Sequence, residues 1–224
     1  MLKLISSMAT RQLLADFAAL WQDKSGIKVV VESVGGVDAA KRVQAGEVFD
    51  GVVLAGDAID KLIASGHLLA GSRIDLVHSN VAVAVKAGAL VPDISSEAAL
   101  RRAIEAAPSI GYSTGPSGVA LIKLFERWGI SRDLASCLVK APPGVPVAAL
   151  VARGEVAIGF QQLSELIKEE GITVVGVLPE SVAITTVFSA ATSALCEQAD
   201  KLRQFLAWMR APDVLAVKQR HGMY

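Results

Sequence analysis

Hydroxyl side chains and glycines are concentrated in one stretch of the chain, where a short apolar run gives way to a helical pattern. The stretch contains Ser113, Thr114, Gly115, Pro116, Ser117, Gly118 and Val119. Backbone N–H groups at a helix start have no intrahelical partner and carry partial positive charge, so they favour anions. A nucleotide P-loop is excluded, because no Lys-Ser or Lys-Thr pair follows the last glycine. We therefore predict an anion-binding helix start here.

A second stretch of this kind follows the first apolar run of the chain. It contains Ser6, Ser7, Met8 and Ala9, whose small side chains let the backbone approach a ligand. The hydroxyls can donate to that ligand, or Ser7 can simply cap the next helix. Arg11 follows in the first helical turn, where it is either a ligand-binding cation or a solvated surface residue.

Two glycine-containing stretches complete the set of predicted ligand contacts. Gly35, Gly36 and Val37 precede a helical pattern, and a glycine pair can turn its N–H groups toward an anion. In the proline-rich stretch 142–146, the rigid prolines fix the entry into another helix, so Gly144 and Val145 can offer N–H groups.

The predicted ligand is a carboxylate, because of three polar side chains near these stretches. The guanidinium of Arg11 forms a planar fork that matches both oxygens of a carboxylate. Gln161 and Gln162 follow a predicted strand, and their amides can bind a further carboxyl or hydroxyl group. We expect a small di- or tricarboxylic acid.

The composition excludes several other classes of protein. Lysine plus arginine equals aspartate plus glutamate at 22 each, so no overall positive field indicates a nucleic-acid partner. Cys137 and Cys196 are too few for a disulfide framework and are predicted to be buried thiols, and no Cys/His spacing suggests zinc. No cofactor or metal is predicted. No apolar run is long enough to cross a membrane, and the first residues lack a signal-peptide core.

Short β-branched runs alternate with amphipathic stretches along the chain, which favours an α/β fold with mostly parallel sheets. The predicted strands are 2–5, 27–31, 52–55, 79–86, 109–112, 136–140, 156–160, 172–177 and 182–188. Helices are predicted between them, with Gly26 ending the first, Asp57 capping the third and Ser95 capping the fourth, and two more close the chain at 197–209 and 212–221. The long strand from 79 predicts a crossing into a second lobe. We predict lobe 1 over 1–80 and 183–224 and lobe 2 over 81–182; a single doubly wound domain is the alternative.

In the order and spacing of its motifs, the chain resembles the periplasmic molybdate-binding protein family and its relatives, the solute-binding proteins of bacterial ABC importers. The stretches that carry the resemblance are 6–10, 43–50, 111–119, 150–159 and 212–222. The resemblance implies a two-lobed type II periplasmic-binding-protein fold, each lobe a sheet flanked by helices. It also implies a ligand held in a cleft between the lobes by N–H groups and hydroxyls, and an ABC permease as partner.

Departures from the family argue against molybdate itself. Molybdate binders place a serine near Ala9, a serine cluster at Gly35 to Val37 and a tyrosine near Gln161, so three hydroxyl contacts are missing here. An oxyanion without them would keep unpaired acceptors, at a cost of about 1 to 3 kcal/mol each. Molybdate or tungstate is therefore the weaker alternative to an organic acid.

The expected function is capture of the anion by lobe closure for import, with bending at 79–83 and 180–186, by a monomer that is not embedded in the membrane. We expect it in the periplasm if a leader has been removed, and in the cytoplasm if the chain is complete. A transcription-regulator effector domain would need a preceding DNA-binding helix pair, which this sequence does not show.

A carboxylate isomerase of the aconitate type, using the same cleft, is the main alternative function. It would need a general base, and Glu32, Asp57 and His78 are near predicted strand ends or the hinge. His67 and His221 show no carboxylate or cysteine partner at catalytic spacing in the sequence.

Overall fold

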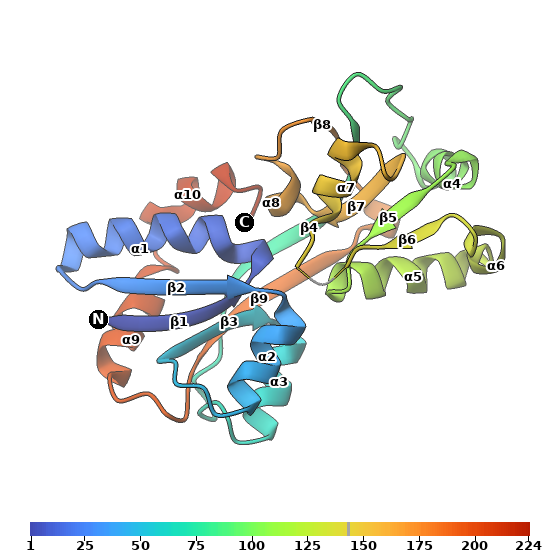
Figure 1. Cartoon of the computed structure of the whole chain (residues 1–224). Helices are drawn as coiled ribbons and strands as arrows, with labels where there is room; N and C mark the ends of the chain where they lie inside the picture. Colours follow the sequence, from blue (N-terminus) through green and yellow to red (C-terminus); the bar gives the residue numbers. More distant parts are fainter. Residues whose placement is uncertain (143) are drawn as a thin grey trace. The chain divides into compact units, whose positions relative to one another are not determined.

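The computed structural model describes residues 1–142 and 144–224, so Pro143 of the predicted proline-rich stretch lies outside the described residues. The chain forms two compact units (Figure 1). Unit 1 contains Met1–His78 and Val187–Tyr224, and unit 2 contains Ser79–Thr186. The chain passes from one unit to the other within two strands, β4 (Ile74–Lys86) and β9 (Thr185–Thr192).

In unit 1, the first strand of the chain lies inside the sheet, between two parallel neighbours. β1 (Leu2–Ser7) pairs in parallel with β2 (Val29–Val34) and with β3 (Gly51–Ala55). β3 then pairs with β9 in antiparallel register, Gly51 opposite Thr192. The remaining elements are η1 (Met8–Thr10), α1 (Arg11–Ser25), α2 (Gly36–Gln44), α3 (Gly56–Ala64), α9 (Ala199–Trp208), η3 (Pro212–Val214) and α10 (Leu215–Arg220).

Helix α1 covers one face of this sheet because its apolar residues recur at helical spacing. Leu13, Phe17 and Trp21 are buried against β1 and the C-terminal helices. The Trp21 ring lies 5.7 Å from that of Phe205 in α9. Gly26, with φ of 70°, ends the helix as predicted, since this left-handed conformation suits glycine. Helices α2 and α3 lie on the opposite side (Figure 1) and form a separate core with the strands.

In unit 2, a parallel core of three strands is extended by two antiparallel ones. β5 (Ile110–Tyr112) pairs in parallel with β6 (Leu138–Lys140) and with β7 (Ile158–Gln162). β4 pairs with β7 and with β8 (Ile172–Val177) in antiparallel register. The other elements are α4 (Glu97–Ala106), α5 (Pro116–Trp128), α6 (Ser131–Leu134), α7 (Val147–Arg153), α8 (Leu163–Leu166) and η2 (Glu180–Val182).

Two predicted helix caps are wrong. Ala55, not Asp57, is the N-cap of α3, because β3 runs directly into the helix and leaves Asp57 in its first turn. Ser96, not Ser95, is the N-cap of α4, and its hydroxyl accepts a hydrogen bond from the Ala99 N–H. Cys137 and Cys196 are free, as expected, but only half-buried.

Candidate anion-binding groups in each unit

The two predicted stretches of unit 1 lie side by side at the carboxyl end of β1. The Ser6 hydroxyl lies 2.6 Å from that of Ser33 at the end of β2. A Cβ added to Gly36, the first residue of α2, would lie 3.7 Å from the Cβ of Ser7. Strand ends of this kind are where open α/β sheets bind ligands.

Ser7 carries a hydroxyl whose hydrogen-bonding capacity is unused. Its side chain is 7% exposed, and its Oγ has no partner among the described residues. Ser7 occupies the N-cap position of η1 but makes no side-chain capping bond, so the capping alternative does not account for it. Buried hydroxyls are normally paired, so this one points to a missing acceptor or donor. Met8 and the buried Ala9 follow it in η1.

Arg11 is exposed and begins helix α1. No ion pair or hydrogen bond joins its side chain to any part of the chain that the structure describes. The first turn of α1 contains no acidic residue, so nothing there opposes an anion. By contrast, Asp38 lies in the first turn of α2, and a Cβ on Gly35 would be 3.3 Å from its Oδ2. The N–H groups near Gly35 and the exposed Val37 therefore face a local negative charge.

The three predicted stretches of unit 2 also meet at one sheet edge. Tyr112, the last residue of β5, pairs with Lys140 of β6 on one side and Phe160 of β7 on the other. The Ala141 N–H donates to the Tyr112 carbonyl over 2.9 Å, which extends the pairing beyond β6. The segments that follow these strands thus begin next to one another.

The first of them, Ser113 to Val119, forms the start of α5. The Ser113 hydroxyl lies 2.9 Å from that of Ser117 and accepts the Gly115 N–H at 3.3 Å. A Cβ on Gly118 would lie 1.9 Å from the Ser113 carbonyl oxygen, so only glycine fits there. The first turn contains Pro116 and no acid. Helix geometry leaves the N–H groups of Ser117 and Gly118 without intrahelical acceptors, while Thr114 and Val119 are exposed.

The proline-rich stretch and Gln161 each form hydrogen bonds within unit 2. Gly144 has a φ of 76°, and the Val145 N–H already donates to the Pro142 carbonyl at 3.0 Å. Gln161 is the next-to-last residue of β7, not a residue after it. Its Oε1 accepts the Ala148 N–H at 3.0 Å, and its Nε2 donates to Glu165 at 2.8 Å. Both ends of this amide thus connect β7 to neighbouring helices.

Gln162 differs from its neighbour because half of its amide is unpaired. Its Nε2 donates to the Thr186 hydroxyl at 2.7 Å, while its Oε1 is buried without a partner among the described residues. The side chain is 3% exposed. Like the Ser7 hydroxyl, this oxygen is available to a ligand group.

Of the three residues considered as general bases, Glu32 and His78 are poorly suited to that role, and Asp57 is the exception. Glu32 accepts a hydrogen bond from Arg42 at 2.6 Å, which lowers the pKa of its carboxyl group and weakens it as a base. The His78 ring packs against Tyr224, with 5.4 Å between ring centroids. Asp57 is exposed in the first turn of α3.

Two further features could suggest nucleophilic catalysis. His221 does have a carboxylate partner, Asp16 at 2.8 Å, which the sequence could not reveal across 205 positions. The spacing of Gly111, Ser113 and Gly115 also fits the nucleophile elbow of hydrolases. However, the three histidines of the chain, including His221, all belong to unit 1, so unit 2 offers Ser113 no histidine base.

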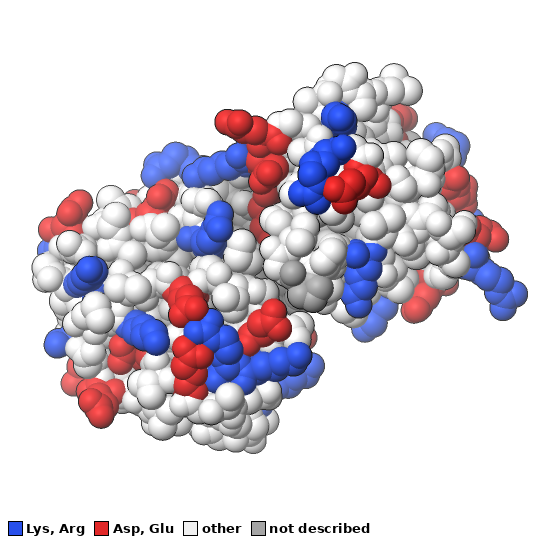
Figure 2. Space-filling view, in the orientation of Figure 1, with Lys and Arg blue, Asp and Glu red and all other residues white. Residues whose placement is uncertain are grey.

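The described residues show no metal site, and the visible face of each unit carries charges of both signs. Among residues 1–142 and 144–224, no group of three His, Cys, Asp or Glu side chains could hold a metal ion. Within the same residues, no helix is long and apolar enough to cross a membrane. On the visible face of each unit, positive and negative side chains are interspersed (Figure 2), in agreement with the net charge of zero.

Comparison with known proteins identifies the family. The family model described as bacterial extracellular solute-binding protein matches residues 2–224. The chain belongs to this family. A curated relative, aconitate isomerase from a Pseudomonas species, is 35% identical over 228 residues, which cover 99% of this chain and 87% of that protein.

Solved structures of solute-binding proteins share the fold. The periplasmic molybdate-binding protein of Azotobacter vinelandii matches with a TM-score of 0.84 and 20% identity, covering 100% of this chain and 99% of that one. A tungstate ABC transporter structure from Geobacter sulfurreducens matches with a TM-score of 0.75 and 16% identity, covering 96% of each chain. The predicted α/β periplasmic-binding-protein fold and the molybdate-binding-like family are therefore confirmed.

Proposed function

We propose that this solute-binding protein binds a small organic polycarboxylate. The observation that carries the proposal is Arg11, an exposed guanidinium without a partner among the described residues, at the acid-free start of α1. The unpaired hydroxyl of Ser7 lies four residues before it. Unit 2 has comparable groups of its own, the acid-free start of α5 and the unpaired Gln162 oxygen.

The chemistry of these groups favours a carboxylate over a tetrahedral metal oxyanion. A guanidinium donates two parallel hydrogen bonds to the two oxygens of one carboxylate. Backbone N–H groups at the helix starts can take a second carboxylate. The Gln162 oxygen is an acceptor, so it suits a ligand hydroxyl and does not by itself favour a carboxylate over a metal oxyanion.

The curated relative supports the same ligand class. Its name specifies aconitate, a tricarboxylate, and its identity to this chain is 35%, whereas the molybdate-binding structure shares 20%. At the positions where the resemblance to molybdate binders implies serines and a tyrosine, this chain has Ala9, Gly35 to Val37 and the glutamines.

Isothermal titration calorimetry with citrate, cis-aconitate, trans-aconitate, molybdate and sulfate tests this proposal. We expect a tricarboxylate to bind most tightly. Arg11→Gln should weaken its binding about tenfold or more, because a charged hydrogen-bond donor is lost. Arg220→Gln, which removes an exposed arginine of α10, is the matched control and should leave the affinity unchanged. Tightest binding of molybdate, or equal affinities of Arg11→Gln and the wild type, would refute the proposal.

Isomerisation of the bound acid is the second candidate function, favoured by the name of the curated relative. Incubation of the protein with cis- or trans-aconitate, followed by proton NMR, tests it directly. If the chain is an isomerase, one isomer converts to the other at a rate proportional to protein concentration. Among the candidate bases, we expect Asp57→Asn to reduce the rate and Glu32→Gln to leave it nearly unchanged, because Arg42 already engages Glu32.

If the protein binds the acid without converting it, we propose that it delivers the acid to an ABC permease. In this role it acts outside the cytoplasm as a monomer. Uptake of isotope-labelled tricarboxylate by cells with and without this protein distinguishes the two functions. Loss of uptake in the absence of the protein supports delivery. Unchanged uptake, together with isomerisation by the purified protein, would favour the enzyme.

A further inference from the structure

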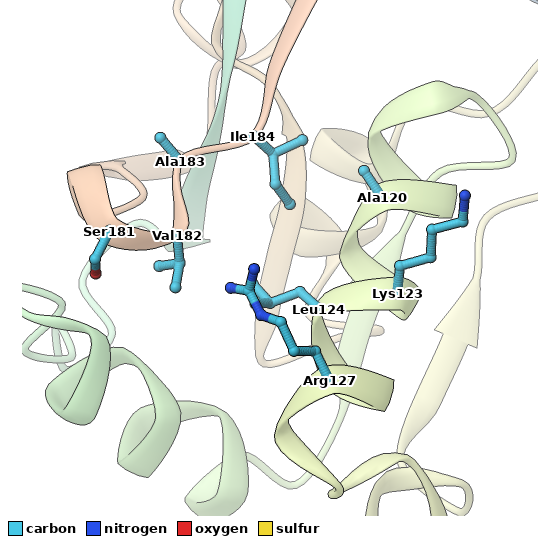
Figure 3. Close-up of a pocket in the computed structure, with 8 residues that line it drawn as sticks. All are labelled: Ala120, Lys123, Leu124, Arg127, Ser181, Val182, Ala183 and Ile184. Carbon is cyan, nitrogen blue, oxygen red and sulfur yellow. The ribbon is translucent and has the colours of Figure 1, made fainter.

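Unit 2 contains a groove between the middle of helix α5 and the segment that includes η2 (Figure 3). Its volume is about 340 Å³. The lining residues are Ala120, Lys123, Leu124, Arg127, Ser181, Val182, Ala183 and Ile184. Arg127 follows Gly118 by nine positions on α5, so Arg127 lies about 14 Å along the helix from the donors at its start, whereas Ala120 borders the groove near that start.

The floor of the groove is apolar and firmly held. Leu124 and Val182 are 5% and 4% exposed and belong to the main core of unit 2. Ile184, partly buried, packs against the same core and points into the groove (Figure 3). Because these side chains are packed from behind, the floor keeps its shape whether or not a ligand is present.

Arg127 places a positive charge over this floor. Its guanidinium extends from α5 toward Val182 (Figure 3). No ion pair or hydrogen bond of the Arg127 side chain is found among the described residues. Lys123 lies one helical turn earlier and is exposed at the rim, also without an ion pair there.

The carboxylate of Glu97 interacts electrostatically with Arg127, but it forms its hydrogen bonds with Trp128 and with Ser181, a lining residue of the groove. Glu97 of α4 accepts a hydrogen bond from the Trp128 indole N–H at 2.7 Å. Hydrogen bonds from Trp128 and then Ser181 keep the pKa of Glu97 below its usual value. Its interaction with Arg127 is electrostatic and does not bring the two groups into an ion pair. The guanidinium therefore keeps its donors for another anion.

We propose that this groove is a second binding site, specific for the carboxylate of a short aliphatic acid. The carboxylate binds the Arg127 guanidinium with Lys123 nearby, and the aliphatic chain covers Leu124, Val182 and Ile184. The volume is at the lower end of the range for small-molecule sites, about 300 to 1,000 Å³. An acid of about six carbons fits within this volume, whereas a protein partner would need a larger contact surface.

Trp128 provides a local reporter for a test on the full chain. It follows the lining residue Arg127 in α5 and shares the Glu97 carboxylate with the lining residue Ser181. It is the single tryptophan of unit 2, since Trp21 and Trp208 belong to unit 1. The protein is labelled with 5-fluorotryptophan, and Trp128→Phe assigns its ¹⁹F resonance. Sodium hexanoate is then titrated at constant ionic strength, with hexylammonium and hexanol as probes of equal chain length. We expect a saturable shift of the Trp128 signal with hexanoate alone.

Variants identify the groups responsible. Arg127→Gln should weaken hexanoate binding about tenfold and Lys123→Gln two- to threefold, because only Arg127 extends over the floor. Arg102→Gln, an exposed arginine of α4, is the matched control and should bind like the wild type. Equal shifts with hexanol, no saturable shift, or an unaltered affinity of Arg127→Gln with an unchanged melting temperature would each overturn the proposal.

This site is independent of the polycarboxylate groups around Arg11. In the Arg11→Gln variant, the Trp128 shift with hexanoate should persist with the same affinity. If the shift disappears in that variant, hexanoate acts through the groups of unit 1, and the groove is not a binding site.

Discussion

The starts of α1 and α5 resemble each other in sequence, since serines precede a helix in both, yet they are built differently. At α1, the Ser7 hydroxyl and the Arg11 guanidinium have no partner among the described residues. At α5, Ser113 and Ser117 bond to each other, and Gly118 packs against the Ser113 backbone. The first start therefore has free side-chain groups for a ligand, whereas the second has a fixed backbone that presents its N–H groups.

The largest effect that this comparison predicts is a loss of protein stability when the start of α5 is altered. In Gly118→Ala, the new Cβ would overlap the Ser113 carbonyl oxygen at 1.9 Å, so the helix start must shift. We expect a loss of about 3 kcal/mol or more in the free energy of unfolding, measured by urea denaturation. Gly115→Ala is the matched control, because its Cβ would meet the Ser113 hydroxyl at 3.8 Å, and it should change stability by less than about 1 kcal/mol. Similar losses in both variants would mean that α5 does not depend on this close packing.

Removing one serine hydroxyl from each start should separate stability from binding. Ser117→Ala breaks the bond to Ser113 and should lower the free energy of unfolding by about 1 kcal/mol. Ser7→Ala removes a hydroxyl without a described partner, so the free protein should be as stable as the wild type or slightly more stable. Its affinity for the tricarboxylate should nevertheless fall several-fold in calorimetry. A destabilised Ser7→Ala protein with normal affinity would reverse our assignment of the two serines.

The charge of Asp38 offers a smaller test within unit 1. Asp38→Asn removes the acid from the first turn of α2, next to Gly35. Because a negative charge at a helix start opposes an anion there, we expect two- to threefold tighter tricarboxylate binding, on the order of 0.5 kcal/mol. Asp213→Asn, in η3, is the control and should not alter affinity. Unchanged binding in Asp38→Asn would exclude the Gly35 to Val37 stretch from the site.

The smallest expected effect is on how the melting temperature falls at low pH when the arginine of a surface ion pair is replaced. Hydrogen bonds from Arg42 lower the pKa of both Glu32 and Glu47 in unit 1, whereas Arg153 lowers only that of Glu155 in unit 2. A lowered folded-state pKa stabilises the protein above the unfolded value of about 4.3 and loses that effect as pH falls further. Between about pH 5 and pH 3, the melting temperature of Arg42→Gln should therefore fall less than that of the wild type. Arg153→Gln should show a smaller difference, and equal pH profiles for all three proteins would contradict the pKa directions.

The sequence predicted the regular elements where local signals agree with tertiary packing. Helix α1 ends at Gly26 because the left-handed turn and the buried face of Leu13, Phe17 and Trp21 act together. Strand β8 was predicted with the bounds that it has, Ile172–Val177. Strand β9 was placed too early, at 182–188, because its apolar composition continues back into η2 and hides the turn after Pro179.

The contacts of the candidate groups could not be predicted, because they depend on residues distant in sequence. The packing of Gly36 beside Ser7 joins two strand ends, and no periodicity shows it. Gln161 and Gln162 look alike in sequence, but the Gln161 amide is hydrogen-bonded at both ends, to Ala148 and Glu165, while Gln162 keeps an unpaired oxygen. The groove at Arg127 was missed as well, since an arginine in a helix usually lies in solvent.

The pairing of β3 with β9 has a consequence for synthesis of the chain on the ribosome. When β1, β2 and β3 have left the ribosome, the outer edge of β3 has no pairing partner. Its partner strand, which includes Thr192, is translated only after all of unit 2. Unit 2 is continuous in sequence and can fold during this interval, because its own strands are already present. Unit 1 meanwhile exposes an apolar strand edge, the kind of surface that aggregates or recruits chaperones. A strand translated after all of unit 2 thus completes the sheet that the first segment began.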